Sequence, residues 1–245
     1  MPVILLEASE YKTFAKVYDI LNYDMPYNLW LDIITEVKGE SSSVLDIGAG
    51  TGEVLKQIVA ARKLGIDNSQ GMINTAKVND PSSEYILADM ITMDLNESFD
   101  LIIATADVLN YAPSQAEFMQ VLKNVRNHLN DGGTFLFDVH TEHKMLNDFN
   151  YELYSDSTDD IFYNWQTIPG EHALSVWHEL TFFIKESADL YRKYEETHYQ
   201  QTYKHSEILK MIIDAGFTID KSFSDFDTSN VITEVAERNF YIVKK

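Results

Sequence analysis

Three closely spaced glycines stand out in residues 44–52, which read Val-Leu-Asp-Ile-Gly-Ala-Gly-Thr-Gly. An apolar run carrying Asp46 precedes them, and apolar residues at helical spacing resume after Glu53. This order predicts a strand, a glycine turn and a helix. Glycine tolerates positive φ and lets a ligand lie against the main chain, while a helix N-terminus offers unpaired N–H groups. We therefore predict a nucleotide-like ligand here, the alternative being an ordinary tight turn.

Acidic residues end the two strands predicted next along the chain. Asp67 closes a short strand and follows Asp46 at about the 20-residue separation that places a carboxylate on a ribose in nucleotide-binding βαβ units. Asp89 and Met90 end the strand after that. In a parallel sheet the carboxyl ends of the strands lie at one edge, where ligands bind. These side chains should therefore converge.

Three further polar residues follow the fourth and fifth predicted strands. Asp107 and Tyr111 lie just after the fourth strand, and His140 lies just after the fifth. Each is a candidate general base for a reaction at this edge. Asp107 could instead cap the following turn, Tyr111 could pack in the wall of the site, and His140 could be a satisfied loop histidine. His140 and His143 do not have the zinc-protease spacing, so no metal site is predicted.

Strands and helices alternate along most of the chain, which predicts an α/β, doubly wound, Rossmann-like fold with a mainly parallel seven-stranded sheet. The expected strands cover residues 44–47, 63–67, 84–88, 99–104, 134–139, 217–223 and 239–243. The expected helices cover residues 10–21, 26–37, 69–76, 115–129 and 206–215, with one more after Glu53.

The pattern changes between the fifth strand and the last helix. Residues 145–203 contain runs rich in Tyr, Phe, Trp, Thr and Val with visible alternation, and Pro169-Gly170 supplies a turn signal. This predicts a small antiparallel sheet of three or four strands inserted after strand five. We expect residues 1–144 and 204–245 to form the ligand-binding domain and residues 145–203 to form a lid or substrate subdomain.

Composition excludes several classes of function. The chain has 245 residues and a formal net charge of −20, so a nucleic-acid partner is unlikely because phosphates would be repelled. It has no cysteine, hence no disulfide, thiolate nucleophile or cysteine-based zinc site. No apolar stretch approaches the roughly 20 residues of a membrane span, and no signal peptide is evident. A cytoplasmic protein is expected, and a homodimer is compatible with the sequence.

The identity of the nucleotide depends on one position. A dinucleotide fingerprint, Gly-x-Gly-x-x-Gly, needs glycine where this chain has Glu53. The pattern Asp-x-Gly-x-Gly-x-Gly, followed by Asp67 and then Asp89-Met90 at successive strand ends, resembles the class I S-adenosylmethionine-dependent methyltransferases. The similarity covers nearly the whole chain in element order. More narrowly, the motifs resemble a bacterial methyltransferase group that includes the YqeM-like proteins. These motifs are Phe14-Ala15-x-x-Tyr18-Asp19, Pro26-Tyr27-x-x-Trp30, Asp107-x-Leu109-Asn110-Tyr111, Phe137-Asp138-Val139-His140 and Glu195-Glu196-x-His198-x-Gln200.

The resemblance implies S-adenosyl-L-methionine as cofactor and assigns contacts to it. Gly48, Ala49 and Gly50 would lie against its methionine portion and sugar, and Asp46 would orient the glycine loop or a water near its ammonium group.

The strand ends would hold the rest of the cofactor. Asp67, with Asn68 beside it, would bind the ribose hydroxyls, and Asp89 and Met90 would contact the adenine. Tyr18 and Trp30 become candidates for closing over the cofactor, because aromatic faces attract a sulfonium as they do an ammonium.

The resulting prediction is methyl transfer to an N or O atom of a small molecule by in-line displacement. Alignment alone can contribute roughly 7–11 kcal/mol, so a base is needed only for a protonated acceptor. The inserted sheet would cover the cofactor and form the acceptor pocket. Two alternatives stay open: methylation of RNA or protein, and a cofactor-binding module without turnover.

Overall fold

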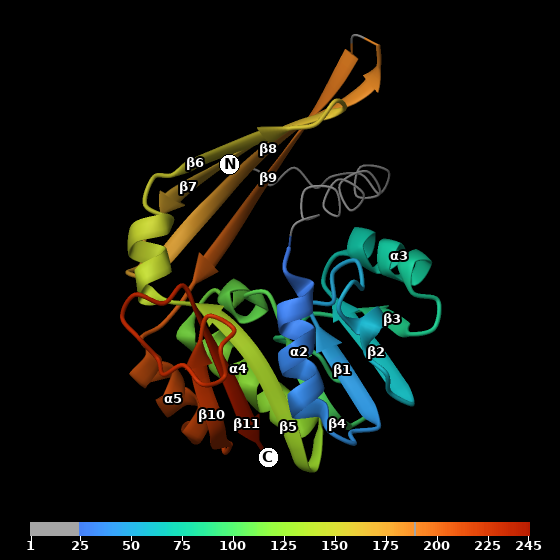
Figure 1. Ribbon diagram of the computed structural model, residues 1–245, viewed down its shortest axis with the longest axis vertical. Helices are drawn as coiled ribbons and strands as arrows, with labels where there is room; N and C mark the ends of the chain where they lie inside the picture. The colour runs from blue at the N-terminus through green and yellow to red at the C-terminus, as the bar shows by residue number, and fades with distance from the viewer. Residues whose placement is uncertain (1–24, 189) are drawn as a thin grey trace.

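A computed structural model describes residues 25–188 and 190–245, and in this part of the chain seven strands form one sheet in the order β10-β11-β5-β4-β1-β2-β3 (Figure 1). The strands are β1 (Ser43–Ile47), β2 (Arg62–Asp67), β3 (Glu84–Leu87), β4 (Phe99–Ala104), β5 (Leu129–His140), β10 (Thr218–Ser224) and β11 (Arg238–Lys244). Neighbours from β5 to β3 are parallel, whereas β11 runs antiparallel to β5 and β10. The predicted α/β fold with a mainly parallel seven-stranded sheet is confirmed.

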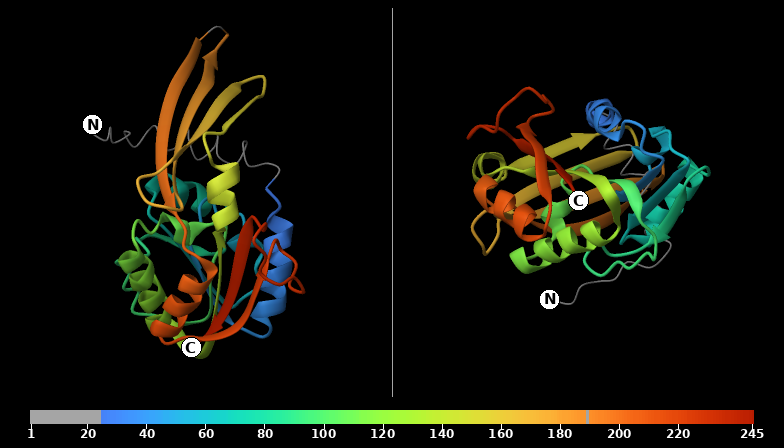
Figure 2. Two further views of the ribbon diagram at one scale, coloured as in Figure 1. Left: turned by 90° about the vertical axis from the view of Figure 1, so that its left-hand side faces the viewer. Right: turned by 90° about the horizontal axis from the view of Figure 1, so that it is seen from below.

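Helices cover both faces of this sheet (Figure 2). They are α2 (Tyr27–Lys38), α3 (Gln70–Asn79), α4 (Gln115–Asn127) and α5 (His205–Asp214). Ile33 of α2 and Ile73 of α3 belong to one buried cluster, and Phe118 of α4 and Ile208 of α5 belong to the other. Serine side chains cap the N-termini of two of these helices: Ser69 accepts from the N–H of Met72, and Ser114 accepts from the N–H of Glu117.

The prediction of a helix after Glu53 is wrong. The chain forms only a single 3₁₀ turn there, η1 (Leu55–Gln57), before β2 begins at Arg62. Too few residues separate the glycine turn from β2 for a helix to run the length of the sheet and return. The N–H groups of a helix N-terminus are consequently not part of the ligand site, which is built from the glycine turn itself.

The predicted insertion forms a second, four-stranded antiparallel sheet in the order β6-β7-β8-β9. Its strands are β6 (Leu153–Ser157), β7 (Ile161–Pro169), β8 (Ser175–Ser187) and β9 (Leu190–Gln201). A π-helical turn, η3 (Lys144–Asp148), leads into it from β5. Figure 1 shows this sheet rising beyond the end of β5. The division of the chain into domains at residues 144 and 204 stays a prediction.

The chain enters and leaves the four-stranded sheet at neighbouring points. The Thr202 hydroxyl donates to the carbonyl of His140 at 2.6 Å. Asn110, in the 3₁₀ turn η2 (Val108–Tyr111), accepts from the His140 N–H at 3.0 Å and donates to the Gln201 carbonyl at 2.9 Å. Fully buried Asn110 thus fixes the junction of the two sheets beside the carboxyl ends of β4 and β5.

None of the helices described in residues 25–188 and 190–245 has the length and apolar character needed to span a bilayer.

Candidate functional site

The glycine turn has the backbone that the sequence predicts. Gly48, Gly50 and Gly52 have φ values of 68°, 54° and 85°, in the left-handed region that glycine tolerates best. A Cβ at Gly48 would lie 2.4 Å from a methyl of Val108, so glycine lets the turn pack on the start of η2. A Cβ at Gly50 would meet nothing within 4 Å. The main chain at Gly50 therefore faces open space suited to a ligand.

Asp67, at the end of β2, is joined to this turn. Its Oδ2 accepts from the N–H of Gly50 at 3.0 Å, and its Oδ1 accepts from the N–H of Ser69 at 2.8 Å. Burial raises the pKa of this carboxyl despite these hydrogen bonds. A carboxylate fixed in this way keeps lone pairs available for hydroxyl donors, as a ribose would require.

Asp46 lies beneath the turn on β1 and is 2% exposed. Burial, together with the charge of Asp67, raises the pKa of Asp46 to about 8. Neither carboxyl forms an ion pair with a cation of the described residues. Asp46 is therefore mainly protonated at neutral pH in this state, and a positively charged ligand group placed beside it would favour its ionised form.

The adenine-side candidates lie at the carboxyl end of β3 and beyond β2. Asp89 is exposed, and its Oδ1 accepts from the N–H of Ile91 at 2.7 Å, which fixes the turn. Met90 is partly buried against the core, and Asn68 is exposed. The structure thus places Asp67, Asn68, Asp89 and Met90 along one edge of the sheet, as predicted.

The aromatic candidates for closing over the cofactor fare differently. Tyr18 lies outside the described residues. Trp30 is 2% exposed, and its Nε1 donates to Asp138 at 2.9 Å. Its ring has Arg238 at 5.2 Å over one face and Phe226 edge-on at 4.6 Å. Burial and these contacts leave the Trp30 indole little free surface, and its role in closing over the cofactor stays a prediction.

Asp138, on β5, organises the backbone after β4. It is fully buried and accepts from Trp30 and from the N–H groups of Ala106 and Asp107 at 2.9 and 3.0 Å, and it pairs with Arg238 of β11. Ala106 and Asp107 both have positive φ, at 60° and 58°. The Asp138 carboxylate therefore stabilises a strained turn that aims Asp107 at the junction of the sheets.

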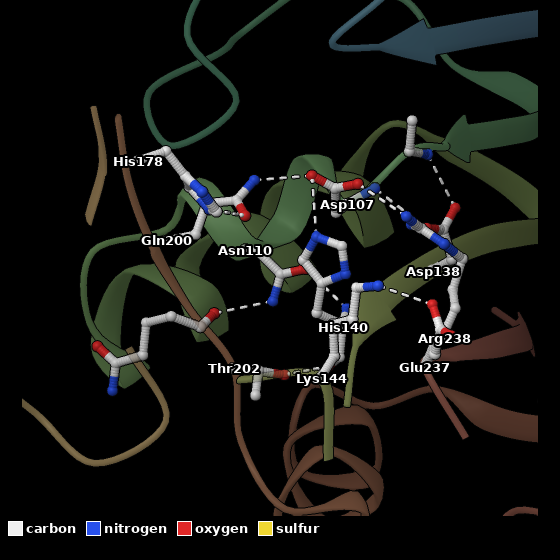
Figure 3. Close-up of polar contacts among 12 residues, drawn as sticks. Asp107, Asn110, Asp138, His140, Lys144, His178, Gln200, Thr202, Glu237 and Arg238 are labelled. Atoms are coloured by element: carbon white, nitrogen blue, oxygen red, sulfur yellow. Dashed lines mark hydrogen bonds and ion pairs between the residues drawn. The ribbon is translucent and has the colours of Figure 1, made fainter. Parts of the chain in front are cut away.

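Asp107 is surrounded by donors (Figure 3). Its Oδ1 accepts from Arg238 at 3.0 Å and its Oδ2 accepts from Gln200 at 2.7 Å, with His140 Nε2 at 3.5 Å from the same oxygen. Although burial favours the neutral form, His140 and Arg238 hold the pKa of Asp107 well below its usual range. A carboxylate so strongly stabilised is a weak base and a strong orienting group.

A directed chain of hydrogen bonds runs from the four-stranded sheet to Asp107. Trp165 on β7 donates to Nδ1 of His178 on β8 at 3.0 Å. His178 Nε2 must then donate to the Gln200 carbonyl oxygen at 3.0 Å, which turns the Gln200 amide N–H toward Asp107. Burial lowers the pKa of His178 to about 4, so the neutral tautomer persists at neutral pH. We call Trp165, His178 and Gln200 the relay.

His140 and Asp107 are brought together, as the sequence predicts for this edge. His140 is 6% exposed, and its Nε2 faces Asp107 while its Nδ1 has no hydrogen-bond partner among the described residues. Tyr111 lies on η2, is 44% exposed and packs edge-on against His198 at 5.9 Å. Of the three candidate bases, His140 alone combines burial, an orienting carboxylate and an unused nitrogen.

A cavity of about 430 Å³ opens beside His140. Its wall comes from η3, the start of β11 and the loop that precedes β11. The lining residues are His140, Lys144, Asp225, Phe226, Val235, Glu237 and Arg238. In residues 25–188 and 190–245 no group of three or more His, Asp or Glu side chains converges in a way that could hold a metal ion.

Sequence reasoning assigned no role to Asp138, Gln200, His178 or Arg238. Asp138 and His140 are two apart on one strand and share a face, so alternation could have placed them together. Arg238 reaches them only because β11 pairs antiparallel with β5, opposing Arg238 to His140. No local pattern encodes that pairing, and the same holds for Gln200, which crosses from the second sheet.

The fold and the glycine turn place this chain in the class of S-adenosylmethionine-dependent methyltransferases through their likeness to solved members. A solved structure of that description from Clostridium acetobutylicum ATCC 824 has a TM-score of 0.83 and 26% identity, covering 96% of this chain and 98% of the other. The sugar N-methyltransferase KedS8 from Streptoalloteichus sp ATCC 53650 shares the fold, with a TM-score of 0.74, 18% identity and 92% coverage of both chains. Residues 44–133 match the family model of a methyltransferase domain.

The full-length relatives narrow the assignment. The Bacillus subtilis (strain 168) protein "Putative methyltransferase YqeM" is 33% identical over 96% of this chain and 97% of its own length. The chain belongs to the same methyltransferase family, and its cofactor is S-adenosylmethionine, as the sequence predicts.

Proposed function

We propose that this protein transfers the methyl group of S-adenosylmethionine to a nitrogen or oxygen atom of a small molecule, with His140 as general base and Asp107 as its positioning residue. The observation that carries the proposal is the buried His140 ring, which has Asp107 at Nε2 and an unpartnered Nδ1 facing away from it. A base must reach the acceptor proton with a free lone pair, and Nδ1 offers one.

The residues around the glycine turn fit the cofactor. When bound, it supplies a methyl group on a positively charged sulfonium, which makes that carbon the electrophile. Open space over Gly50 would take the methionine portion, and Asp67 would hold the ribose. The uncompensated carboxyls of Asp46 and Asp67 favour the positive charges of the bound group. Val108, which packs on Gly48, lies next to Asp107 and links the cofactor turn to the candidate base.

Two observations support a small acceptor. The cavity beside His140 measures about 430 Å³, within the usual size of small-molecule sites. A net charge of −20 opposes binding of nucleic acid. The likeness to KedS8, a sugar N-methyltransferase, agrees with a small polar acceptor for this chain as well.

Transfer itself is tested with methyl-labelled S-adenosylmethionine and fractionated cell metabolites. Label entering small molecules supports the proposal. Label entering only RNA or protein would replace it with the macromolecular alternative, and tight cofactor binding with no transfer to any fraction would indicate a binding module.

The role of His140 is tested by His140→Gln, with His143→Gln as matched control. His143 lies three positions along, outside the cluster, and contacts Asn147. We expect His140→Gln to reduce kcat by about 10²–10⁴-fold, the usual contribution of a positioned base, with unchanged cofactor affinity. His143→Gln should behave as wild type. Equal activity of the two variants would remove His140 from the mechanism.

The ribose assignment is tested by calorimetry on Asp67→Ala, with exposed Asp94→Ala as the matched charge control. Loss of a charge-assisted pair of hydrogen bonds should weaken cofactor binding about tenfold or more. Wild-type affinity in Asp67→Ala would contradict the assignment.

A further inference from the structure

The cavity beside His140 has a defined polarity, because the relay determines which hydrogen atoms face Asp107. Trp165 can only donate, so His178 accepts at Nδ1 and donates at Nε2, and Gln200 presents its N–H to Asp107. Asp107 is held as an acceptor by Gln200 and Arg238 together. The His140 nitrogen facing that carboxylate, Nε2, therefore carries hydrogen.

It follows that the second nitrogen of the ring is an acceptor. The charge of His140 acts on Asp107 only when the ring is protonated; in the neutral form of His140 one nitrogen donates and the other accepts, so Nδ1 then presents a lone pair. This atom is buried and has no partner among the described residues. A buried unsatisfied acceptor costs about 1–3 kcal/mol, so a ligand that supplies an N–H or O–H donor would be favoured there.

The charges around the cavity determine whether a ligand that donates to His140 is favoured as a cation, a neutral molecule or an anion. Lys144 is paired with Asp148 and Glu237 at 3.2 and 2.7 Å, and Arg238 is paired with Asp107 and Asp138. Asp225 adds a further carboxylate to the wall, and its Oδ1 accepts from the N–H groups of Glu237 and Arg238 at 3.0 Å each.

The cavity lining itself holds two carboxylates, Asp225 and Glu237, and two cations, Lys144 and Arg238. Three further carboxylates outside the lining pair with these cations, so carboxylates outnumber cations in the group as a whole: Asp107, Asp138 and Asp148. Both cations are already shared between two carboxylates, so an anionic ligand would face repulsion without a cation left for it. A cationic ligand would meet excess negative charge. Phe226 and Val235 supply apolar wall for a carbon skeleton.

We infer that the cavity lined by His140, Asp225 and Glu237 binds the methyl acceptor as a small protonated amine, whose N–H donates to His140 Nδ1. This inference rests on the proposed function and narrows its acceptor from nitrogen or oxygen to an amine nitrogen. On binding, the N–H bond breaks toward Nδ1, the proton resides on His140 between the acceptor and Asp107, and the electron pair stays on the acceptor nitrogen. The amine is then neutral and nucleophilic.

The polarity of the site is tested with three probes of similar size, each built on a central carbon that carries hydroxymethyl groups. Tris carries a protonated amine on that carbon at about pH 7, pentaerythritol has a hydroxymethyl group in its place, and 2,2-bis(hydroxymethyl)propionate carries a carboxylate and a methyl group. The full-length protein, labelled with ¹⁵N in its histidines and without cofactor, is titrated while the His140 imidazole signals are followed by NMR. His140→Gln assigns those signals.

We expect Tris to shift the Nδ1 signal of His140 saturably, pentaerythritol to bind about tenfold more weakly and the carboxylate probe to cause no shift. Asp225→Asn and Glu237→Gln should each weaken Tris binding severalfold, whereas Asp220→Asn should not. Asp220 loses the same charge at an exposed ion pair with Lys244, away from the cavity. Asn at position 225 keeps an oxygen to accept the two N–H groups that Asp225 holds.

No response to Tris, or equal responses to Tris and pentaerythritol, would overturn the inference. Tighter binding of the carboxylate would overturn it as well. Because these measurements need neither cofactor nor turnover, they can fail while methyl transfer succeeds, or succeed while transfer fails. The two proposals are therefore separately testable.

Discussion

At the scale of single residues, the site depends on buried carboxyl groups that differ in how they are balanced. Asp107 and Asp138 each accept hydrogen bonds from several donors and pair with Arg238, whereas Asp46 has only burial and a second carboxyl beside it. The first pair builds the framework of the site. Asp46 instead has its ionised form disfavoured by burial, so its ionisation comes at the expense of stability.

That expense predicts a pH dependence of folding. Because the pKa of Asp46 is about 8 in the folded state and near 3.8 when unfolded, the unfolded state releases this proton first as pH rises. The free energy of unfolding should fall by up to about 1.4 kcal/mol per pH unit between these values through this group. Asp46→Asn should remove the loss, so the variant should exceed wild type most at about pH 8.

Urea unfolding of both proteins at about pH 5, 6.5 and 8 measures this difference. The comparison needs no cofactor. A stability gap between variant and wild type that stays constant across the three pH values would refute the shift at Asp46.

A second residue-level prediction concerns the relay. Gln200→Leu removes the amide N–H that Asp107 accepts and leaves the cofactor turn untouched. We expect kcat to fall about tenfold or more, with unchanged cofactor affinity and an altered pH profile, because Asp107 loses one of the donors that fix its position. Gln201→Leu, at the next position of the same strand, is the control, since Asn110 contacts only the backbone of Gln201 and its side chain accepts from the Tyr199 hydroxyl instead of reaching Asp107.

At the scale of elements, the candidate cofactor residues and the relay lie on different sheets. The glycine turn and Asp67 belong wholly to the seven-stranded sheet, while the relay belongs to the four-stranded one. That residues 145–203 form a lid or substrate subdomain stays a prediction.

Replacing residues 145–201 by a short glycine-serine linker tests whether the four-stranded sheet contributes to the acceptor site. The junction contacts of His140 and Thr202 would remain available to the linker ends. We expect methyl transfer to be lost while calorimetry still detects cofactor binding, and circular dichroism should show that the helices of the remaining sheet persist. Unchanged transfer in the folded deletion would exclude the four-stranded sheet from the acceptor site.

Sequence reasoning succeeded where local pattern decides structure. The apolar runs ending in Asp46 and Asp67 gave correct strands because buried parallel strands need continuous apolar residues. The prediction of a helix after Glu53 failed because the connection to β2 is too short for a helix, although its apolar residues have helical spacing. Sequence reasoning also missed Arg238, whose place beside His140 depends on strand pairing between distant segments.

At the scale of the whole molecule, the cofactor should stabilise the fold. A ligand at 100 times its Kd adds about 2.7 kcal/mol, which for a chain of this size corresponds to a rise in Tm of roughly 5–10 °C. Thermal unfolding with S-adenosylmethionine measures this rise. NAD is the matched control, since Glu53 replaces the glycine that a dinucleotide turn requires. An equal rise with NAD would contradict the cofactor assignment.

The junction at His140, Asn110 and Thr202 has a consequence for how such a protein can diversify. The chain leaves the seven-stranded sheet at His140 and returns to it at Thr202, and these two residues are hydrogen-bonded to each other. The four-stranded sheet could therefore be removed or exchanged without opening the seven-stranded sheet. Evolution, or an engineer, could graft a different sheet at this junction and change the molecule to be methylated. The seven-stranded sheet and its glycine turn would stay unchanged.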